Sequence, residues 1–294
     1  MGINNFNLYF YKKFYQESNF GSTLTIGRQI SMYSRYMSFQ FDDLFNKDNI
    51  YAEKVFIKNF GSTKCDSIDI SGYENPTYTY DLTTELNINL PQYDTIIDSG
   101  SIEHTKNPYK TLENYSKLCK INGRIIINTP LNNLSGHGYF QISIDFFVSF
   151  FSKENGFTDL ECYVADWSEF SRFYPIYIYK IDLEDIKKGL IMRSTKPLHV
   201  FFKAKKNSEV KIDMTGQESY KSIYENQASL NSNIIDKYNK EYSKSTIIIL
   251  NFLKLSFLFF KSFINTQYRI GDITTNEKSH IKKIKIKDLI RTKD

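Results

Sequence analysis

Cysteine, histidine and proline are scarce in this chain, which holds three, four and six of them among 294 residues. Cys65, Cys119 and Cys162 are far apart and odd in number, with no C-x-x-C pair and no histidine at a metal-ligand spacing. The sequence therefore predicts a reducing compartment and no bound metal. No basic start followed by an apolar run is visible at the N-terminus, so we predict no secretory signal and a cytoplasmic location.

An excess of charge of one sign is also lacking over most of the chain. The net charge is +5, and the basic excess lies after residue 206, where 15 Lys and Arg face 10 Asp and Glu. A nucleic-acid-binding protein is expected to concentrate more positive charge on one element. We therefore expect no nucleic-acid partner for the first 206 residues.

One stretch, Tyr93 to Pro130, has the pattern of a strand, a helix and a second strand. The β-branched run at 95–97 is closed by Asp98 and Gly100, and Asn107-Pro108 is a typical helix start. We predict that Gly123 ends the helix and that 124–128 forms the second strand. Such units imply parallel strands joined by right-handed crossovers.

The remaining segments extend this unit into an α/β domain. We predict further strands at 22–29, 65–70, 78–82, 157–164 and 197–202, with two helices between 30 and 60 and a helix at 144–151. The prediction is a Rossmann-like, doubly wound, seven-stranded and mostly parallel sheet over residues 1–206. Residues 207–294 are predicted to be a polar and amphipathic helical extension. Residues 5–16 read as a lid or as a helix packed on the sheet, and residues 174–189 as an extra strand and helix of a substrate cap.

Small and acidic residues fall at the ends of four successive predicted strands. Gly27, Asp69, Asp81 and the run Asp98 to Gly100 occupy these positions. Open α/β sheets bind ligands outside the carboxyl ends of their strands, and a bound nucleoside needs a close backbone turn and carboxylates for its hydroxyl groups. Aspartates also cap loops at such ends, so each position has a purely structural alternative.

The order of these segments resembles the motif series of class I S-adenosylmethionine-dependent methyltransferases, and is closest to the type-11-like branch. Five segments carry the resemblance: S-T-L-T-I-G-R-Q, S-I-D-I, Y-D-L, Y-D-T-I-I-D-S-G-S-I-E-H and I-N-G-R-I-I-I-N-T-P. The family usually has an acidic residue before its first glycine and a G-x-G-x-G loop, whereas this chain has Thr25 and then Gly27-Arg28-Gln29. The resemblance implies S-adenosylmethionine as cofactor. Because the first loop departs from the family's pattern, two alternatives follow: Arg28 pairs with the cofactor carboxylate, or the site is empty. The implied cofactor-binding residues are Gly27, Arg28, Gln29, Asp69, Ile70, Asp81, Leu82, Asp98, Ser99 and Gly100.

The same resemblance implies methyl transfer to an acceptor, most simply at a hydroxyl of a small molecule or of a sugar or glycan precursor. His104, which follows Glu103, and His137, in a G-H-G loop, are the candidate bases because an imidazole titrates near neutral pH. Glu103 and His104 also read as residues that only hold the loop. Tyr139 and Gln141 are candidates for binding the acceptor.

Two other functions stay open. The first is a catalytically inactive protein of the same fold that serves as a binding or scaffolding module, which the missing glycines favour. The second is an enzyme that binds NAD or a nucleotide sugar, which the absence of G-x-G-x-x-G disfavours.

The extension contains one long apolar segment, Ile247 to Ile264. If it is helical, a narrow polar stripe on it is formed by Asn251, Lys254, Lys261 and Asn265. Its two lysines cancel most of the free energy gained by inserting it across a bilayer. We predict peripheral contact with a membrane or a partner subunit, with docking on its own domain as the alternative.

Overall fold

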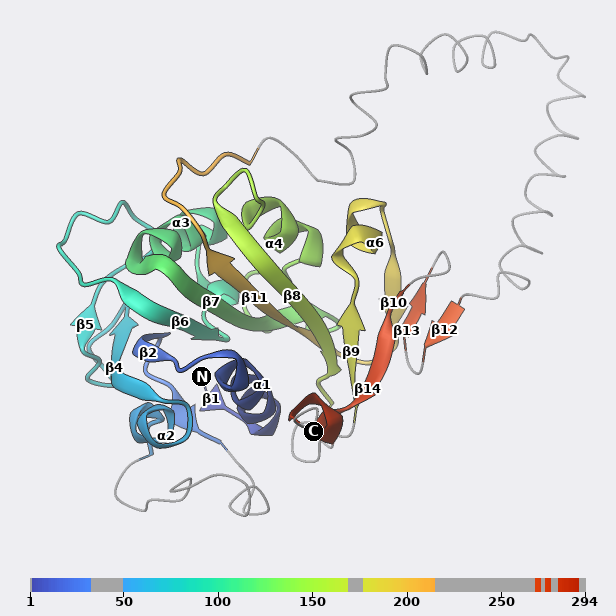
Figure 1. Cartoon of the computed structure of the whole chain (residues 1–294), viewed down its shortest axis with the longest axis horizontal. Coiled ribbons are helices and arrows are strands. Elements are labelled where there is room, and N and C mark those ends of the chain that lie inside the picture. Colours follow the sequence, from blue (N-terminus) through green and yellow to red (C-terminus); the bar gives the residue numbers. More distant parts are fainter. Residues whose placement is uncertain are drawn as a thin grey trace, which may run out of the picture.

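The fold is a nine-stranded sheet with helices on both faces (Figure 1). The computed structural model describes residues 2–32, 50–168, 177–214, 268–270, 273–275 and 280–290. In spatial order the strands of the sheet are β14 (Lys282–Lys285), β9 (Tyr177–Ile181), β8 (Phe157–Asp166), β11 (Leu198–Lys206), β7 (Cys119–Asn132), β6 (Tyr93–Ser99), β2 (Gly21–Ile26), β4 (Ser62–Asp69) and β5 (Tyr78–Thr79).

The strand order confirms the predicted fold class. Strands β5, β4, β2, β6 and β7 are parallel neighbours, and the winding reverses between β2 and β6. This is the arrangement of a doubly wound Rossmann-like sheet, whose ligand site lies where the winding reverses. Strand β11 enters antiparallel between β7 and β8, and β9 and β14 then extend that edge beyond the seven predicted strands.

The other described elements are short strands and helices. The helices are α1 (Asn5–Glu17), α2 (Glu53–Asn59), α3 (Pro108–Leu118), α4 (Ile144–Phe150) and α6 (Leu183–Lys187), with 3-10 turns η2 (Ile102–His104) and η3 (Ile286–Ile290). The short strands are β1 (Gly2–Ile3), β3 (Ile30–Ser31), β10 (Met192–Ser194), β12 (Tyr268–Ile270) and β13 (Ile273–Thr275).

The predicted unit around α3 forms largely as expected. The side chain of Asn107 accepts the amide of Lys110 at 3.1 Å, and Pro108 occupies the first turn. The expectation that Gly123 ends this helix is wrong, because the helix ends at Leu118 and one long strand, β7, begins at Cys119. Gly123 lies inside β7, where a Cβ atom would sit 2.9 Å from the Asp94 carbonyl oxygen.

Apolar side chains from both helical layers bury the two faces of the sheet. Helices α1 and α2 cover one face, and α3 and α4 cover the other (Figure 1). Phe10 of α1 stacks on Phe201 of β11 with ring centroids 4.1 Å apart. Helix α1 is therefore packed on the sheet, which is the second of the two readings given for residues 5–16.

The far edge of the sheet corrects two expectations. Strand β9 and helix α6 do not form a cap, because β9 pairs with β8 on the side of the sheet away from β2 and β4. Within the predicted helical extension, Lys282–Lys285 is a strand that pairs antiparallel with β9. This part of the extension therefore belongs to the sheet.

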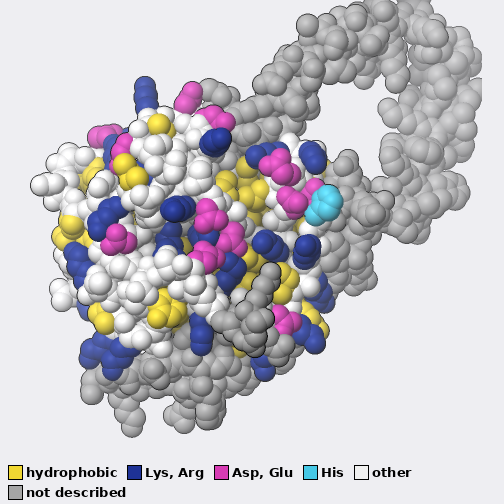
Figure 2. All heavy atoms as spheres, in the orientation of Figure 1, with side chains coloured by type: hydrophobic (Ala, Val, Ile, Leu, Met, Phe, Trp, Pro, Cys, Tyr) yellow, Lys and Arg dark blue, Asp and Glu magenta, His cyan; other side chains and the backbone are white. Residues whose placement is uncertain are grey.

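Several predictions fall on residues outside the described ranges. Of the two helices expected between 30 and 60, the structure describes only α2. The whole segment from Ile247 to Ile264 lies outside the described residues. Among the described residues, no helix combines the length and the apolar composition needed to cross a bilayer. On the face shown in Figure 2, acidic and basic side chains are interspersed, without an extended area of one sign.

Candidate functional site

The carboxyl ends of β2, β4, β5 and β6 meet around one pocket of about 280 Å³. It is lined by Ile26, Gly27, Ile68, Asp69, Ile70, Tyr80, Asp81, Leu82, Thr83, Ser101, His104, Thr105, Lys106, Thr111 and Tyr139. The pocket lies at the reversal of winding, where such sheets bind ligands. Seven of the residues proposed from the sequence are among these lining residues.

Gly27 makes the tight turn that opens the pocket. Its φ of +71° lies in the left-handed region, which suits glycine. Its amide donates to the carbonyl oxygen of Ile68 at 2.7 Å, so that the ends of β2 and β4 are held together. The hydroxyl of Ser101, just after β6, donates to the carbonyl oxygen of Ile26 at 2.7 Å and closes the neighbouring side.

Two carboxylates line the pocket in different states of hydrogen bonding. Oδ1 of Asp69 accepts the amide of Ser71 at 3.0 Å, while Oδ2 has no partner within the described part of the chain. Both oxygens of Asp81 are used, by Thr83 at 2.6 Å and by the ammonium of Lys106 at 3.1 Å. The Thr83 hydroxyl, with help from Lys106, lowers the pKa of Asp81. Asp69 therefore offers a ligand an uncommitted acceptor.

Asp98 lies beneath the pocket instead of in its lining. Its buried carboxylate accepts the amides of Ser101 at 2.7 Å and Ile102 at 3.1 Å and the hydroxyl of Tyr115 at 2.8 Å. Burial raises its pKa to about 6 even though these donors favour the charged form. The structure gives Asp98 a positioning role for turn η2, and the direct cofactor contact expected from the sequence is not supported.

Ser99 and Gly100 also stay out of the pocket lining. The hydroxyl of Ser99 is buried and hydrogen-bonded to the hydroxyl of Tyr11 on α1. Gly100 has a φ of +91°, and a Cβ there would lie 3.2 Å from Oε1 of Glu103. Its role is to let the chain turn beside that carboxylate.

Arg28 and Gln29 are not among the residues that line the pocket, in contrast to the expectation. The guanidinium of Arg28 pairs with Glu53 at 2.7 Å, donates to the carbonyl oxygens of Glu74 and Asn75, and lies over the ring of Tyr51. The amide nitrogen of Gln29 donates to the carbonyl oxygen of Ile26 at 2.6 Å. These side chains stabilise the loop instead of presenting a cation to a ligand.

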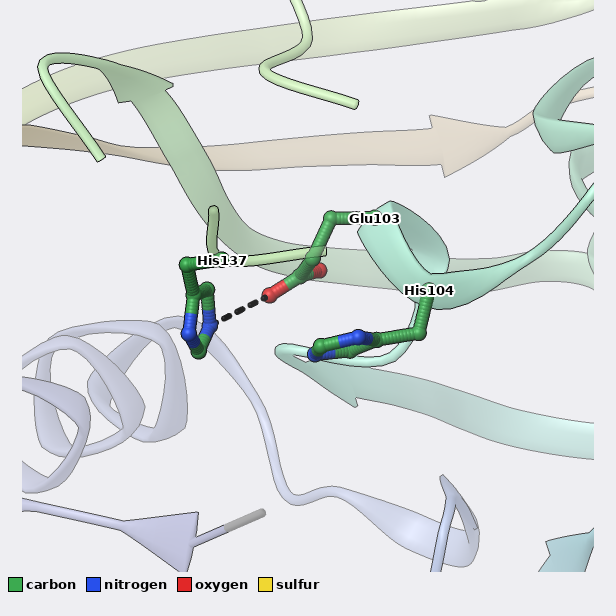
Figure 3. A group of neighbouring side chains, drawn as sticks. All are labelled: Glu103, His104 and His137. Carbon is green, nitrogen blue, oxygen red and sulfur yellow. Dashed lines mark ion pairs between the residues drawn. The ribbon is translucent and has the colours of Figure 1, made fainter. Parts of the chain in front are cut away.

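The three candidate catalytic residues come together beside the pocket, although His137 lies on a loop after β7. Figure 3 shows the carboxylate of Glu103 and the two rings directed toward one another. Nε2 of His137 lies 3.8 Å from Oε1 of Glu103, and the ring centroids of His104 and His137 are 5.2 Å apart. The nearest ligand atoms of all three residues lie within 4.8 Å of one another.

The pKa values of Glu103 and His104 are both shifted from their ordinary values. The side chain of Glu103 is fully buried, which raises its pKa to about 8, and the charge of Asp98 adds to the effect. Desolvation, followed by the nearby His137, lowers the pKa of His104. At neutral pH the imidazole of His104 is therefore uncharged and able to accept a proton, whereas Glu103 retains a proton as long as no cation is bound beside it.

The loop that carries His137 is fixed to turn η2 by its backbone. The amide of Tyr139 donates to the carbonyl oxygen of Glu103 at 2.7 Å, and Gly138 lies so close that a Cβ would be 2.9 Å from Cγ of Glu103. The exposed side chain of Tyr139 lines the pocket. Gln141 instead accepts the amide of Leu134 at 3.0 Å and holds the loop together.

Sequence reasoning missed several lining residues, chiefly Ser101, Thr83 and Lys106. All three are neighbours of residues predicted from the sequence. Ser101 directly follows the run Asp98 to Gly100, and Thr83 and Lys106 bind the carboxylate of Asp81. The Asp-x-Thr spacing at 81–83 was an available signal, because an aspartate often accepts the amide two residues on. The contact with Lys106 had no local signal.

No protein-family model matches the chain, and no curated protein matches it. One solved structure similar to this chain is the N-methyltransferase NodS from Bradyrhizobium japonicum in complex with S-adenosylhomocysteine. The two sequences are 9% identical, the match covers 70% of this chain and 89% of NodS, and the TM-score is 0.41. A second is a methyltransferase from Thermotoga maritima (11% identity, 68% and 89% covered, TM-score 0.39).

A third similar structure is the plantazolicin methyltransferase BpumL with S-adenosylhomocysteine (14% identity, 69% and 83% covered, TM-score 0.37). All three TM-scores lie below 0.5, so the fold class rests on the strand order. The fold is Rossmann-like.

Proposed function

We propose that this chain is a methyltransferase that binds S-adenosylmethionine in the strand-end pocket. The observation that carries the proposal is the uncommitted Oδ2 of Asp69 at the reversal of winding, beside the glycine turn at Gly27. A carboxylate in this position is suited to accept the hydroxyl hydrogens of a ribose. NodS and BpumL, which are solved with S-adenosylhomocysteine, have names consistent with this choice of cofactor.

The pocket suits the nucleoside part of this cofactor. Its volume of about 280 Å³ is close to the lower end of the range of about 300–1,000 Å³ for ligand pockets. Ile70 and Leu82 supply apolar surface for a purine, Asp69 supplies the ribose acceptor, and Thr83 and Lys106 add donors at the rim. The lining residues therefore fit an adenosine group.

When bound, S-adenosylmethionine supplies an electrophilic methyl group that a nucleophilic acceptor displaces from sulfur. The chain's contribution is to align the acceptor, which is worth several kcal/mol in such reactions, and to remove a proton from it. His104 lines the pocket and has a lowered pKa, so we assign it the proton-accepting role for a hydroxyl acceptor. Tyr139, exposed on the same rim, contacts the acceptor in this scheme.

We propose a small molecule or a sugar or glycan precursor as the acceptor. A pocket with an open rim formed by Tyr139 and His104 admits a compact hydroxyl compound. An amine acceptor is the alternative, since NodS is named an N-methyltransferase. Methyl transfer to hydroxyl and amine panels with radiolabelled cofactor would separate the two.

A second candidate function is a catalytically inactive binding protein of the same fold. The observation that favours it is the engagement of Arg28 and Gln29 within the protein, which leaves the first loop without a side chain for the cofactor carboxylate. Methyl transfer to any acceptor that is lost in His104→Ala would exclude it.

Calorimetric titration with S-adenosylmethionine tests the proposed function. We expect binding to the full chain and a loss of at least tenfold in affinity in Asp69→Ala. Asp66→Asn is the control, because Asp66 lies on the same strand but pairs with Lys64 and Tyr93 outside the pocket. No binding to the unaltered chain at millimolar ligand would refute the proposal.

A further inference from the structure

We propose that Glu103, His104 and His137 form a binding site for a first-row divalent transition-metal ion such as Zn²⁺. From the sequence we expected no metal, because no histidine lies at a metal-ligand spacing. The fold brings them together: η2 presents Glu103 and His104, and the loop after β7 presents His137 (Figure 3).

The first observation is the unpartnered oxygen of Glu103. Oε2 accepts the hydroxyl of Thr129 at 3.0 Å, but Oε1 has no hydrogen-bond partner among the residues that the structure describes, although the side chain is fully buried. A buried acceptor without a partner costs about 1–3 kcal/mol. This oxygen faces the two rings, so a bound cation would satisfy it.

The second observation is that the three groups are close without bonding to one another. The 3.8 Å between Nε2 of His137 and Oε1 of Glu103 is longer than a hydrogen bond, and the two rings meet at 71° instead of stacking. Around an ion with bonds of about 2.0–2.2 Å, ligand atoms lie about 3–3.5 Å apart. Because both rings are exposed, small side-chain rotations close this difference.

The backbone keeps the site in place. Amides of Tyr139 and Phe140 donate to the carbonyl oxygen of Glu103 at 2.7 and 3.2 Å, and the glycines at 100 and 138 leave room for its side chain. Metal sites depend on such supporting contacts to orient their ligands. The supporting contacts hold the carboxylate still while the rings adjust.

The ligand set indicates the class of ion. Two imidazoles and one carboxylate suit Zn²⁺, Mn²⁺ or Fe²⁺, whereas Mg²⁺ prefers oxygen ligands and retains water. Three protein ligands leave a coordination position open. Because His104 lines the pocket, that position is beside the rim, where the ion would hold an acceptor oxygen and lower its pKa. With the ion bound, His104 is a ligand, and the lowered pKa of the acceptor replaces the proton-accepting role assigned to the free imidazole. This last consequence rests on the proposed function, whereas metal binding does not.

Titration of the full chain, freed of metal with EDTA, tests the site without any cofactor. We expect Zn²⁺ to bind one site per chain with micromolar or tighter affinity in the presence of millimolar Mg²⁺. We also expect a loss of at least tenfold in Glu103→Gln and in His137→Asn. His280→Asn is the matched control, because His280 forms the other described histidine–carboxylate pair, with Asp185 at 3.1 Å.

Equal Zn²⁺ affinity in the unaltered chain, Glu103→Gln and His137→Asn would overturn the inference, as would a loss of the same size in His280→Asn. Circular dichroism of each variant checks that it is folded, and His137→Asn, whose ring is on an exposed loop, gives a second test if Glu103→Gln unfolds. Failure of this test leaves cofactor binding through Asp69 untouched, so the two proposals fail separately.

Discussion

The backbone amide of Tyr139 donates to the carbonyl oxygen of Glu103 at 2.7 Å and fixes the loop after β7 to the turn after β6. This bond places His137 beside Glu103 and His104, although it belongs to a different element. The geometry of the candidate catalytic group therefore depends on a backbone contact.

Gly138→Ala tests that contact. A Cβ would lie 2.9 Å from Cγ and from the carbonyl oxygen of Glu103, at a φ of +75°. Gly136→Ala is the matched control, since its φ is +87° but no atom of the described residues would lie within 4 Å of the added Cβ. We expect each alanine to lower the free energy of unfolding by about 1–2 kcal/mol through its backbone conformation.

Gly138→Ala should lower the free energy of unfolding by about 1–3 kcal/mol more than Gly136→Ala does, because of the steric overlap with Glu103. Urea denaturation of both variants measures the difference. Equal losses would show that the loop does not pack on Glu103 as described.

Glu161, at the contact between α1 and the sheet, makes the stability of the fold depend on pH. It accepts Lys13 at 2.8 Å and Lys203 at 2.7 Å, and these bonds outweigh its burial and lower its pKa to about 2. A carboxyl whose pKa is lower when folded stabilises the protein above its unfolded pKa, and the stabilisation is lost as the pH falls.

Glu161→Gln should therefore be less stable than the unaltered chain at pH 7. The difference between their free energies of unfolding should shrink by about 2 kcal/mol as the pH falls from 6 to 3. Urea denaturation at these pH values measures it. Glu184→Gln, which removes an exposed pair with Lys187, should change little at any pH. A gap that stays constant with pH would contradict the assigned role of Glu161.

Arg28→Met separates a structural role from a cofactor-binding role. Arg28 pairs with Glu53 and with two backbone carbonyls, so we expect the variant to lose about 1–3 kcal/mol of unfolding free energy. Affinity for S-adenosylmethionine should change less than about threefold, because the guanidinium does not line the pocket. Loss of cofactor binding with unchanged stability would restore the role expected from the sequence.

The apolar segment from Ile247 to Ile264 remains a prediction from its composition. If it contacts membranes peripherally, the full chain should float with anionic vesicles and the double variant Leu253→Asp, Phe257→Asp should not. Equal flotation of the two proteins would dismiss membrane contact through this segment.

Local patterns predicted the strands and the start of α3 well. The β-branched runs at 95–97 and 124–128 lie in β6 and β7, and the Asn107-Pro108 pair begins the helix. These features depend on neighbours in the sequence. The ends of β2, β4 and β5 are equally local, and their meeting in one pocket follows from the parallel order of the strands.

The errors come from partners that are distant in the chain. Arg28 is withdrawn from the pocket by Glu53 and by the loop at 74–75, which no local pattern reveals. Gly123 resembles a helix stop, but the chain had already entered β7 at Cys119. Lysine and isoleucine alternate from Lys283 to Lys287, which is a strand signal, and β14 at the start of this run pairs with β9.

A crystal structure of the chain soaked with S-adenosylhomocysteine is the most direct test of the central claim. The account predicts an adenosine between Ile70 and Leu82, with ribose hydroxyls within hydrogen-bond distance of Oδ2 of Asp69. Ligand density at another place, or a pocket that stays empty at saturating ligand, would contradict it.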